Sequence, residues 1–348
     1  MMRVAAVLAA ILTLSPMIGG CLGTDLVPSL IDDSTENDPL RINHIQMEGT
    51  HNSYHVEPIF SPTREYMYTH QELGVQASEQ GVRQFEIDVW WDVREGLRVY
   101  HNQYDSGTTC PTFQSCLETL LLWSQENNGH HPIMIWIEPK DWLEQGVEIT
   151  TTVELTGILQ EIEDEISQFW PANLTITPDD VRGDRSNLTE GVLEEGWPLI
   201  DESRGKAMFI LLATGDMRGL YMDDRPGLVG ARMFPMFTSQ GQYPGEEVIF
   251  SLTDPIGDGG EITRLVEEGF IVRTRADSGG VEPDNNDTSR FEAALASGAH
   301  TIATDYPGPV EGMDYWIEIP EGNPSRCNPV IAPVWCTSLD IESLETSV

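Results

Sequence analysis

The sequence contains very few basic residues, and lysine is almost missing from it. The 348-residue chain has 57 acidic residues and 19 lysines and arginines, which give a formal net charge of -38 at pH 7. Lys140 and Lys206 are the only lysines. Because such a chain repels polyanions, nucleic acid is excluded as a partner. An acidic, lysine-poor surface is typical of proteins in high salt, where screening within a few ångströms removes the self-repulsion, so we expect a salty habitat.

The beginning of the chain lacks a hydrophobic run long enough for a membrane-spanning helix. Arg3 is followed by an apolar run from Val4 to Leu14 and then by Ile18-Gly19-Gly20-Cys21. This order predicts an export signal over residues 1–21, because the apolar run is too short to cross a bilayer. The small residues before Cys21 resemble the lipobox of prokaryotic lipoproteins, so we expect Cys21 to be lipidated. The alternative is an ordinary secretory signal that is cleaved nearby.

Residues 22–40 have no sustained hydrophobic period and are rich in Asp, Ser, Thr and Pro. This composition predicts a flexible tether between a membrane and a folded domain. We therefore expect an exported protein that is either anchored to the cell surface as a lipoprotein or secreted.

Cysteine is also scarce, and four cysteines remain after Cys21. They form two close pairs in the sequence, Cys110 with Cys116 and Cys327 with Cys336. In an exported protein such cysteines are disulfide candidates. Three pairings are possible in principle, and loop closure favours the two local bridges. Their spacing is not that of a zinc site, so we predict a structural role.

Short apolar runs alternate with helical patterns after residue 40. The runs predict strands that are buried on both faces, and no repeat or Gly/Ser linker divides the chain. This alternation predicts an α/β fold, and the length favours a single closed (β/α)8 barrel over residues 41–320, with a C-terminal extension at 321–348. Function should then gather at the carboxyl ends of the strands. The expected strands are Ile133–Ile137, Ala207–Leu212, Phe270–Val272 and Thr301–Ala303, and the expected helices lie within Leu117–Trp123, Leu155–Phe169, Ile262–Val266 and Phe291–Leu295.

Two carboxylates share one face of a further predicted strand. Glu86 and Asp88 are two residues apart and point to the face opposite the apolar residues around them. Their separation of about 7 Å along the strand lets both approach one cation. Inside a sheet the two charges would be costly unless something neutralised them. The pair therefore predicts a bound cation.

Other polar groups follow expected strands and complete a candidate site. Asn52 and Glu138, together with Glu86 and Asp88, offer only oxygen atoms. Such a set suits Ca2+, or less well Mg2+, and does not suit zinc. Two further groups, His51 and His101, also lie at expected strand ends and stay free to act as acid, base or hydrogen-bond donor.

At these residues the chain resembles the phosphoinositide-specific phospholipase C superfamily, and within it the calcium-dependent branch. The match consists of His51-Asn52, Glu86-x-Asp88, His101 and Glu138, in the family's order and with nearly its spacing. Metal-free bacterial relatives carry an arginine where the cation would otherwise sit, and this chain has Asp88 there. The phrases Gly49–His55, Arg273–Asp277 and Thr304–Pro307 look like those of bacterial secreted members, so the resemblance extends over residues 44–310.

The resemblance implies a calcium-dependent phosphodiesterase on a TIM barrel. In that reaction the inositol 2-hydroxyl attacks its own phosphodiester, which gives a cyclic phosphate and releases diacylglycerol. The implied Ca2+ ligands are Asn52, Glu86, Asp88 and Glu138, and the implied catalytic pair is His51 and His101. Glu86 or a neighbouring group could take the hydroxyl proton, His101 could protonate the leaving oxygen, and His51 could donate to the phosphoryl group.

Three basic residues are candidates for contact with the substrate. Lys140 is a compact point charge that could reach a phosphate where the fork of an arginine would not fit. Arg273 and Arg275 share a face at a strand end, where they could bind phosphate or inositol hydroxyls or instead form salt bridges inside the barrel. The expected partners are a phospholipid or inositol phosphodiester and, through the lipid anchor, a membrane surface, and we expect a monomer.

Two other kinds of function stay open at this point. A glycerophosphodiester phosphodiesterase shares the barrel, the paired acids and two histidines, but that family usually opens with His-Arg-Gly where this chain has His51-Asn52-Ser53. A surface lipoprotein could also bind Ca2+ or phosphate esters without turnover. In that case Ca2+ should stabilise the fold while no phosphodiester is cleaved.

Overall fold

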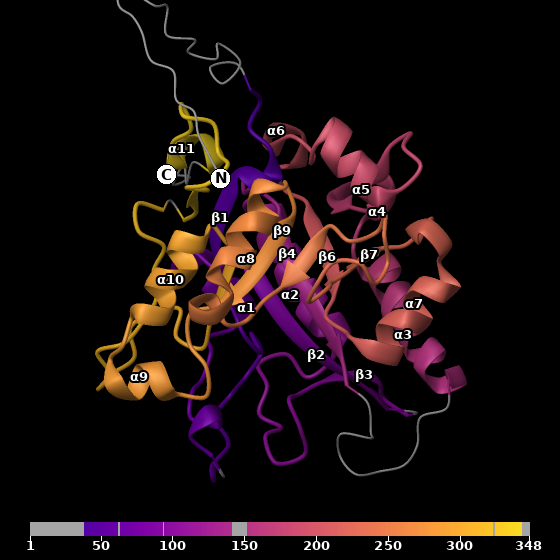
Figure 1. Cartoon of the computed structure of the whole chain (residues 1–348). Coiled ribbons are helices and arrows are strands. Elements are labelled where there is room, and N and C mark those ends of the chain that lie inside the picture. Colours follow the sequence, from indigo (N-terminus) through magenta and orange to yellow (C-terminus); the bar gives the residue numbers. More distant parts are fainter. Residues whose placement is uncertain (1–37, 62, 93, 141–151, 323, 343–348) are drawn as a thin grey trace, which may run out of the picture.

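The computed structural model describes residues 38–342 apart from positions 62, 93, 141–151 and 323. Parallel strands gather in the middle of the molecule, and helices pack around them (Figure 1). The strands that form the central sheet are β1 (Ile45–Thr50), β2 (Gln84–Asp92), β4 (Ile133–Pro139), β6 (Ala207–Leu211), β7 (Met233–Pro235), β8 (Ile249–Ser251), β9 (Ile271–Arg275) and β10 (Thr301–Thr304).

These strands form a closed ring. Parallel pairing runs from β8 through β9, β10, β1, β2, β4 and β6 to β7. The ring closes just after β7, where the Phe237 N–H donates to the Ile249 carbonyl at 2.9 Å and the Ser251 N–H donates to the Phe237 carbonyl at 2.8 Å. The predicted α/β fold with a single (β/α)8-type barrel is therefore confirmed.

Most crossovers between barrel strands contain a helix on the outer surface. The main helices are α1 (Leu73–Glu79), α2 (Phe113–Glu126), α3 (Thr152–Phe169), α7 (Gly215–Asp224), α8 (Pro255–Glu267) and α10 (Ser289–Ser297). Shorter helices are α4 (Pro178–Arg182), α5 (Leu188–Glu190), α6 (Ile200–Ser203), α9 (Val281–Asn285) and α11 (Ser338–Ile341). Residues 238–248, between β7 and β8, form turns and no helix, so the barrel is distorted there.

Hydrophobic periodicity explains how the helices pack. In α3 the side chains of Ile158, Leu159, Ile162 and Ile166 are buried at three- and four-residue spacing, as the sequence predicted. The other expected helices lie within α2, α8 and α10, and the expected strands are β4, β6, β9 and β10, with ends that differ by a few residues. The barrel strands are buried on both faces, which is why they appear in the sequence as continuous apolar runs.

Strands β1 and β2 pair through few residues, and their close approach depends on a glycine. Gly49 pairs with Gln84, and a Cβ atom at Gly49 would lie 2.2 Å from the Oε1 atom of Gln84. The Gln84 side chain instead donates to the Thr50 carbonyl at 3.2 Å. Gly49 is therefore required for the close approach that brings the ends of β1 and β2 together.

The short strands add pairs outside the ring. β3 (Gly96–Val99) runs antiparallel to β2, and β5 (Thr175–Ile176) pairs with the first residues of β6. In the C-terminal extension, β11 (Arg326–Cys327) pairs antiparallel with the start of β1. The two predicted local disulfides, Cys110–Cys116 and Cys327–Cys336, are both present.

A buried ion pair ties the extension to the barrel. Arg83, just before β2, donates to the Glu342 carboxylate at 3.0 Å through Nε and at 2.5 Å through Nη2. Arg83 is 1% exposed and Glu342 is 2% exposed. Each charge would be uncompensated if the other were removed, so the extension is an integral part of the domain.

We predict that Glu342→Gln destabilises the protein strongly, because it leaves the Arg83 charge buried without a counter-ion. The expected loss is about 3 kcal/mol or more in the free energy of unfolding, measured by urea denaturation. The control is Glu261→Gln, which breaks the Arg264–Glu261 pair with side chains 40% and 44% exposed and should cost less than about 1 kcal/mol. Equal losses of unfolding free energy in the two variants would contradict the conclusion that Glu342 ties the C-terminal extension to the barrel.

Candidate active site

A cavity of about 900 Å³ opens at the carboxyl ends of the barrel strands. Side chains from β2, β4 and β9 and from the residue that follows β1 line one part of it, and segments after β6, β7 and β8 line the rest. The structure places five of the sequence-predicted site residues in this lining: His51, Glu86, Glu138, Arg273 and Arg275.

Three predicted metal ligands meet at this end of the barrel. Asp88 on β2 pairs in register with Glu138 on β4. One carboxylate oxygen from each of Glu86, Asp88 and Glu138 lies within 4.8 Å of the others. Asp88 is fully buried, and neither of its side-chain oxygens makes a hydrogen bond of good geometry. A buried carboxylate in this state fits a divalent cation that prefers oxygen ligands.

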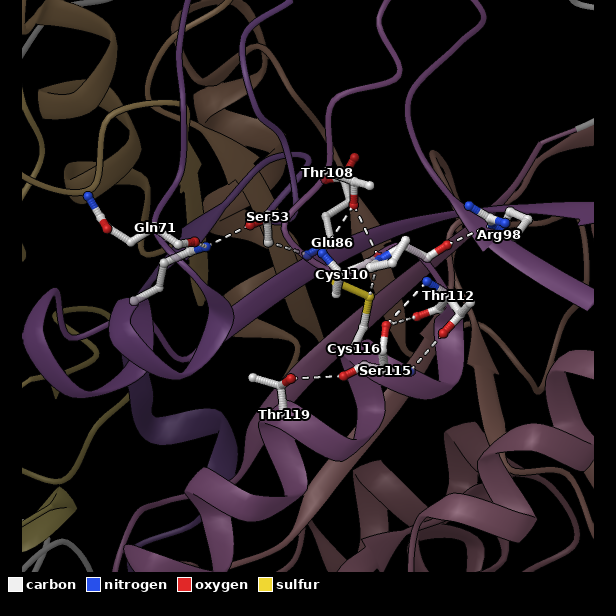
Figure 2. The surroundings of a disulfide bond; sticks show 12 residues. Ser53, Gln71, Glu86, Arg98, Thr108, Cys110, Thr112, Ser115, Cys116 and Thr119 are labelled. Atoms are coloured by element: carbon white, nitrogen blue, oxygen red, sulfur yellow. Dashed lines mark hydrogen bonds between the residues drawn. A yellow bond between two sulfur atoms is a disulfide. The ribbon is translucent and has the colours of Figure 1, made fainter. Parts of the chain in front are cut away.

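The fourth predicted ligand lies in a tight turn after β1. Asn52 is 2% exposed and has a positive φ of 43°, a conformation that asparagine tolerates better than most residues. The next residue holds this turn against β2, because the Ser53 N–H donates to the Glu86 carbonyl at 2.9 Å and the Ser53 hydroxyl accepts from the Glu86 N–H at 2.7 Å (Figure 2). Asn52 is thereby fixed next to the strand that carries two of the carboxylates.

The protein's own cations compensate part of the negative charge. Lys140 Nζ lies 2.6 Å from Glu138 Oε1 and 3.2 Å from Asp88 Oδ2, and the Arg273 guanidinium pairs with Glu86. Burial raises the pKa of Asp88 to about 7; Lys140 opposes the rise, and Glu138 and Glu86 add to it. Burial would also raise the pKa of Glu86, but Arg273 and His51 hold it below its ordinary value. Of the two roles left open for Arg273, the structure therefore has the salt bridge inside the barrel.

His51 is held by an aspartate at the end of β10. Its Nδ1 lies 2.8 Å from Asp305 Oδ1, and its Nε2 is 3.8 Å from Glu86 Oε1. Arg275 lies 3.1 Å from the other Asp305 oxygen. Burial and the Arg275 charge lower the pKa of His51, while Asp305 and Glu86 partly offset them. Since an ionised Asp305 only accepts hydrogen bonds, the neutral ring donates through Nδ1 and presents Nε2 toward Glu86 and the cavity.

His101 is held by a different carboxylate, Asp105. His101 Nδ1 lies 2.9 Å from Asp105 Oδ2, and His55 Nε2 lies 2.8 Å from Asp105 Oδ1. Asp105 and His55 are fully buried, whereas the His101 side chain is 24% exposed. The ring of Tyr66 packs edge-on against His101 with 5.2 Å between centroids. Burial lowers the pKa of His101, but the Asp105 hydrogen bond and the Asp88 charge outweigh it, so the net shift is upward.

Asp105 was not among the site residues predicted from the sequence. The signal available in the sequence was weak, since Asp105 lies in a polar loop with no periodicity. Only the fold brings His55 to it, through the antiparallel bridge between His55 and Thr108. Asp305 lies within the phrase Thr304–Pro307 that supports the resemblance, but its partner His51 is 254 positions away.

A disulfide anchors the loop that carries His101 and Asp105. Figure 2 shows Cys110 joined to Cys116 where the chain enters α2. Thr112 caps that helix by accepting from the Ser115 N–H at 3.2 Å, and Arg98 on β3 donates to the Pro111 carbonyl at 2.9 Å. The loop is therefore fixed at its far end to both β3 and α2.

The predicted lipidation site, Cys21, and the export signal lie outside the described residues. Within the described residues, no helix combines the length and apolar character needed to cross a bilayer.

Comparison with known proteins agrees with this geometry. The profile of one family, described as Phosphoinositide phospholipase C, Ca2+-dependent, matches residues 40–102 and 93–329. No curated protein sequence matched significantly. Among solved structures, a Ca2+-dependent phosphatidylinositol-specific phospholipase C from Streptomyces antibioticus is similar, with a TM-score of 0.56, 19% identity, and coverage of 77% of this chain and 95% of that chain.

A second solved structure has a similar fold. It is the calcium-dependent phosphoinositol-specific phospholipase C from Pseudomonas sp, with a TM-score of 0.55, 18% identity, and coverage of 77% of this chain and 91% of that chain. Identities this low show the likeness of fold.

We predict that Asp105→Asn lowers the pKa of His101, because it replaces a charged acceptor by a neutral amide. The pKa of His101 is higher in the folded protein than the value of about 6.5 for an unperturbed histidine. Protonation of His101 therefore stabilises the fold fully below about pH 6.5, and this stabilisation is lost as the pH rises through the pKa of the folded state. The variant should therefore lose about 1–3 kcal/mol at pH 5 and less at pH 9. The measurements are an NMR titration of the His101 ring and urea denaturation at both pH values.

The matched control is Asp258→Asn, which changes an exposed residue in the first turn of α8. It should leave the His101 titration unchanged. An unchanged His101 titration in Asp105→Asn as well would show that Asp105 does not control this ring.

Proposed function

The chain belongs to the family of Ca2+-dependent phosphoinositide phospholipases C, and on this basis we propose that it cleaves phosphatidylinositol-type phospholipids. The products would be diacylglycerol and a cyclic inositol phosphate, formed when the inositol 2-hydroxyl attacks its own phosphodiester. The observation that carries the proposal is the cluster of Glu86, Asp88 and Glu138, whose ligand oxygens lie within 4.8 Å of one another. His51 lines the same cavity as Glu86 and Glu138, and His101 lines a second pocket together with Lys140.

The residues proposed to hold Ca2+ are Asn52, Glu86, Asp88 and Glu138. Their side chains offer only oxygen, and the buried Asp88 oxygens lack hydrogen bonds of good geometry, both of which suit a hard cation. When bound there, Ca2+ would lower the pKa of the attacking hydroxyl and neutralise charge on the phosphoryl oxygens.

His51 is proposed to donate a hydrogen bond from Nε2 to the phosphoryl group as negative charge builds on it. This role requires the doubly protonated ring, which the charges of the bound phosphodiester and of Asp305 favour. Its contact with Asp305 fixes the ring, and its Nε2 edge is directed toward Glu86 at 3.8 Å. The side chain is 25% exposed, so a substrate in the cavity can reach it.

His101 is proposed to act as the general acid. As the new P–O bond to the 2-oxygen forms, the P–O bond to diacylglycerol breaks, and His101 gives a proton to the departing oxygen. The upward shift of its pKa favours the protonated ring near neutral pH. The proton of the 2-hydroxyl would pass to Glu86 or to a neighbouring group, since Glu86 is held ionised in the cavity wall.

The charges that line the cavity favour a substrate whose inositol ring carries no additional phosphate groups. Among the described residues that line it, the basic ones are Arg273 and Arg275, and both are already ion-paired, with Glu86 and Asp305 respectively. Asp216 and Asp223 on α7 also line it, and their charges would repel additional phosphate groups. Arg275, 12% exposed, is the better placed of the two arginines to contact a substrate oxygen.

Exposed apolar side chains on the segments after β1 and β3 support action at a lipid surface. Ile59 and Phe60, on the loop after β1, are 94% and 89% exposed, and Tyr104, on the loop that carries His101, is 72% exposed. Such side chains gain free energy by entering a membrane interface. The net charge of -38 would repel anionic bilayers, so activity on them should rise with salt.

We further propose that the barrel is the catalytic domain of an exported protein, anchored at Cys21 as a surface lipoprotein or secreted. The two disulfides support this compartment, because such bonds persist mainly in oxidising surroundings.

We predict Ca2+-dependent release of cyclic inositol phosphate from phosphatidylinositol micelles, abolished by a chelator. His101→Ala should lower the rate by about 10²–10⁴-fold, because the leaving oxygen loses its proton donor. His44→Ala, which changes a histidine just before β1 at the opposite end of the barrel, should be close to wild type. Cleavage of glycerophosphodiesters instead would favour the rival enzyme, and Ca2+ binding without any product would favour a binding protein.

We also predict that Ile59→Ser combined with Phe60→Ser lowers activity on micelles by about tenfold, from lost burial at the interface. Activity on the soluble substrate glycerophosphoinositol should be preserved. The control is Val334→Ser with Leu339→Ser, which changes residues that are 81% and 67% exposed on the C-terminal extension. Equal losses on soluble and micellar substrate would contradict a role at the interface.

A further inference from the structure

Lys140 occupies the position where a cation would meet the carboxylates. It directly follows β4 and is one of only two lysines in the chain. Its side chain is 9% exposed, and its ammonium nitrogen is 2.6 Å from Glu138 Oε1 and 3.2 Å from Asp88 Oδ2. These oxygens belong to two of the residues that would hold Ca2+. The ammonium and the metal therefore compete for the same two carboxylates.

The two cations compete for this place. A bound Ca2+ lies about 2.3–2.6 Å from each ligand oxygen, and Lys140 Nζ already lies at a similar distance from Glu138. A monovalent and a divalent cation so close together in a buried site would repel each other strongly. Binding of the metal between these carboxylates would therefore favour a position of the Lys140 ammonium away from Asp88 and Glu138.

A second pocket could accommodate the Lys140 ammonium after it leaves the carboxylates. A pocket of about 250 Å³ is lined by Lys140 itself together with Tyr66, Trp90, His101, Asn102, Gln103 and Tyr104. The flexible four-carbon stem of lysine can turn its ammonium into this pocket, whereas the planar fork of arginine is harder to accommodate. In that pocket the ammonium would lie beside His101 and could meet a phosphate oxygen.

We propose that Lys140 is an internal counter-ion, which neutralises Asp88 and Glu138 until a divalent cation displaces it and then contacts the substrate phosphate beside His101. The proposal rests on the proposed function for the identity of the metal site and of the phosphodiester. It adds an order of events, in which the metal binds first and thereby frees the lysine for the phosphate. It also explains why lysine is kept here in a chain whose other basic residues, apart from Lys206, are arginines.

The first test is calorimetric titration of Ca2+ into the whole exported chain, comparing wild type with Lys140→Met. Removing the competing ammonium should tighten Ca2+ binding by about tenfold or more. The matched control is Lys206→Met, which removes the other lysine just before β6, at the opposite end of the barrel, and should stay within about twofold of wild type. Weaker or unchanged Ca2+ binding in Lys140→Met overturns the proposal.

The second test uses wild-type protein, so it does not depend on the folding of a variant. An amine-reactive reagent followed by mass spectrometry reports how accessible each lysine is. With chelator, Lys140 should react slowly, and with Ca2+ it should react about tenfold faster, while Lys206 serves as the internal reference. Added inositol phosphate should slow Lys140 again, but only when Ca2+ is present. A labelling rate of Lys140 that does not rise with Ca2+ overturns displacement.

The outcomes separate this inference from the proposed function. If wild type takes up no Ca2+ in the titration, the metal assignment fails and this inference fails with it. If Ca2+ binds and the phospholipid is cleaved while Lys140 shows no change in labelling, the proposed function stands and only the role of Lys140 is lost.

Discussion

The active end of this barrel depends on the balance of charge among buried side chains. Glu86 and Asp88 point from one strand toward Glu138 on the next. Carboxylates in such a place are very costly unless cations compensate them. Lys140 and Arg273 supply part of that compensation. Replacing buried ion pairs by well-packed apolar residues often makes a protein more stable. Stability alone therefore does not account for charged side chains at this place, and their presence indicates a use in binding and chemistry.

The same principle applies to the two histidines. Each ring is held by its own buried aspartate, His51 by Asp305 and His101 by Asp105. The histidines differ in their surroundings, because Arg275 adds positive charge near His51 while Asp88 adds negative charge near His101. The pKa of the first is lowered and that of the second is raised. Two chemically identical side chains thereby differ in protonation: the neutral His51 ring directs an unprotonated Nε2 toward the cavity, whereas the His101 ring takes up a proton more readily.

Much of this could be predicted from the sequence, for identifiable reasons. Alternation of apolar runs and helical patterns gave the barrel, and the spacing of Glu86 and Asp88 placed both on one face of a strand. What could not be predicted were contacts made only by the closed ring. His51 meets Asp305 because β1 and β10 are neighbours, and Arg273 reaches Glu86 across the barrel from β9. The three-residue strands β7 and β8 are too short to give a clear periodic signal.

The most direct test of this account is a crystal structure with Ca2+, or with a lanthanide whose anomalous scattering locates the ion. We expect a single ion in this cavity, coordinated by Asn52, Glu86, Asp88 and Glu138, with the Lys140 ammonium turned away toward His101. An ion bound elsewhere, with Lys140 still between Asp88 and Glu138, would contradict it.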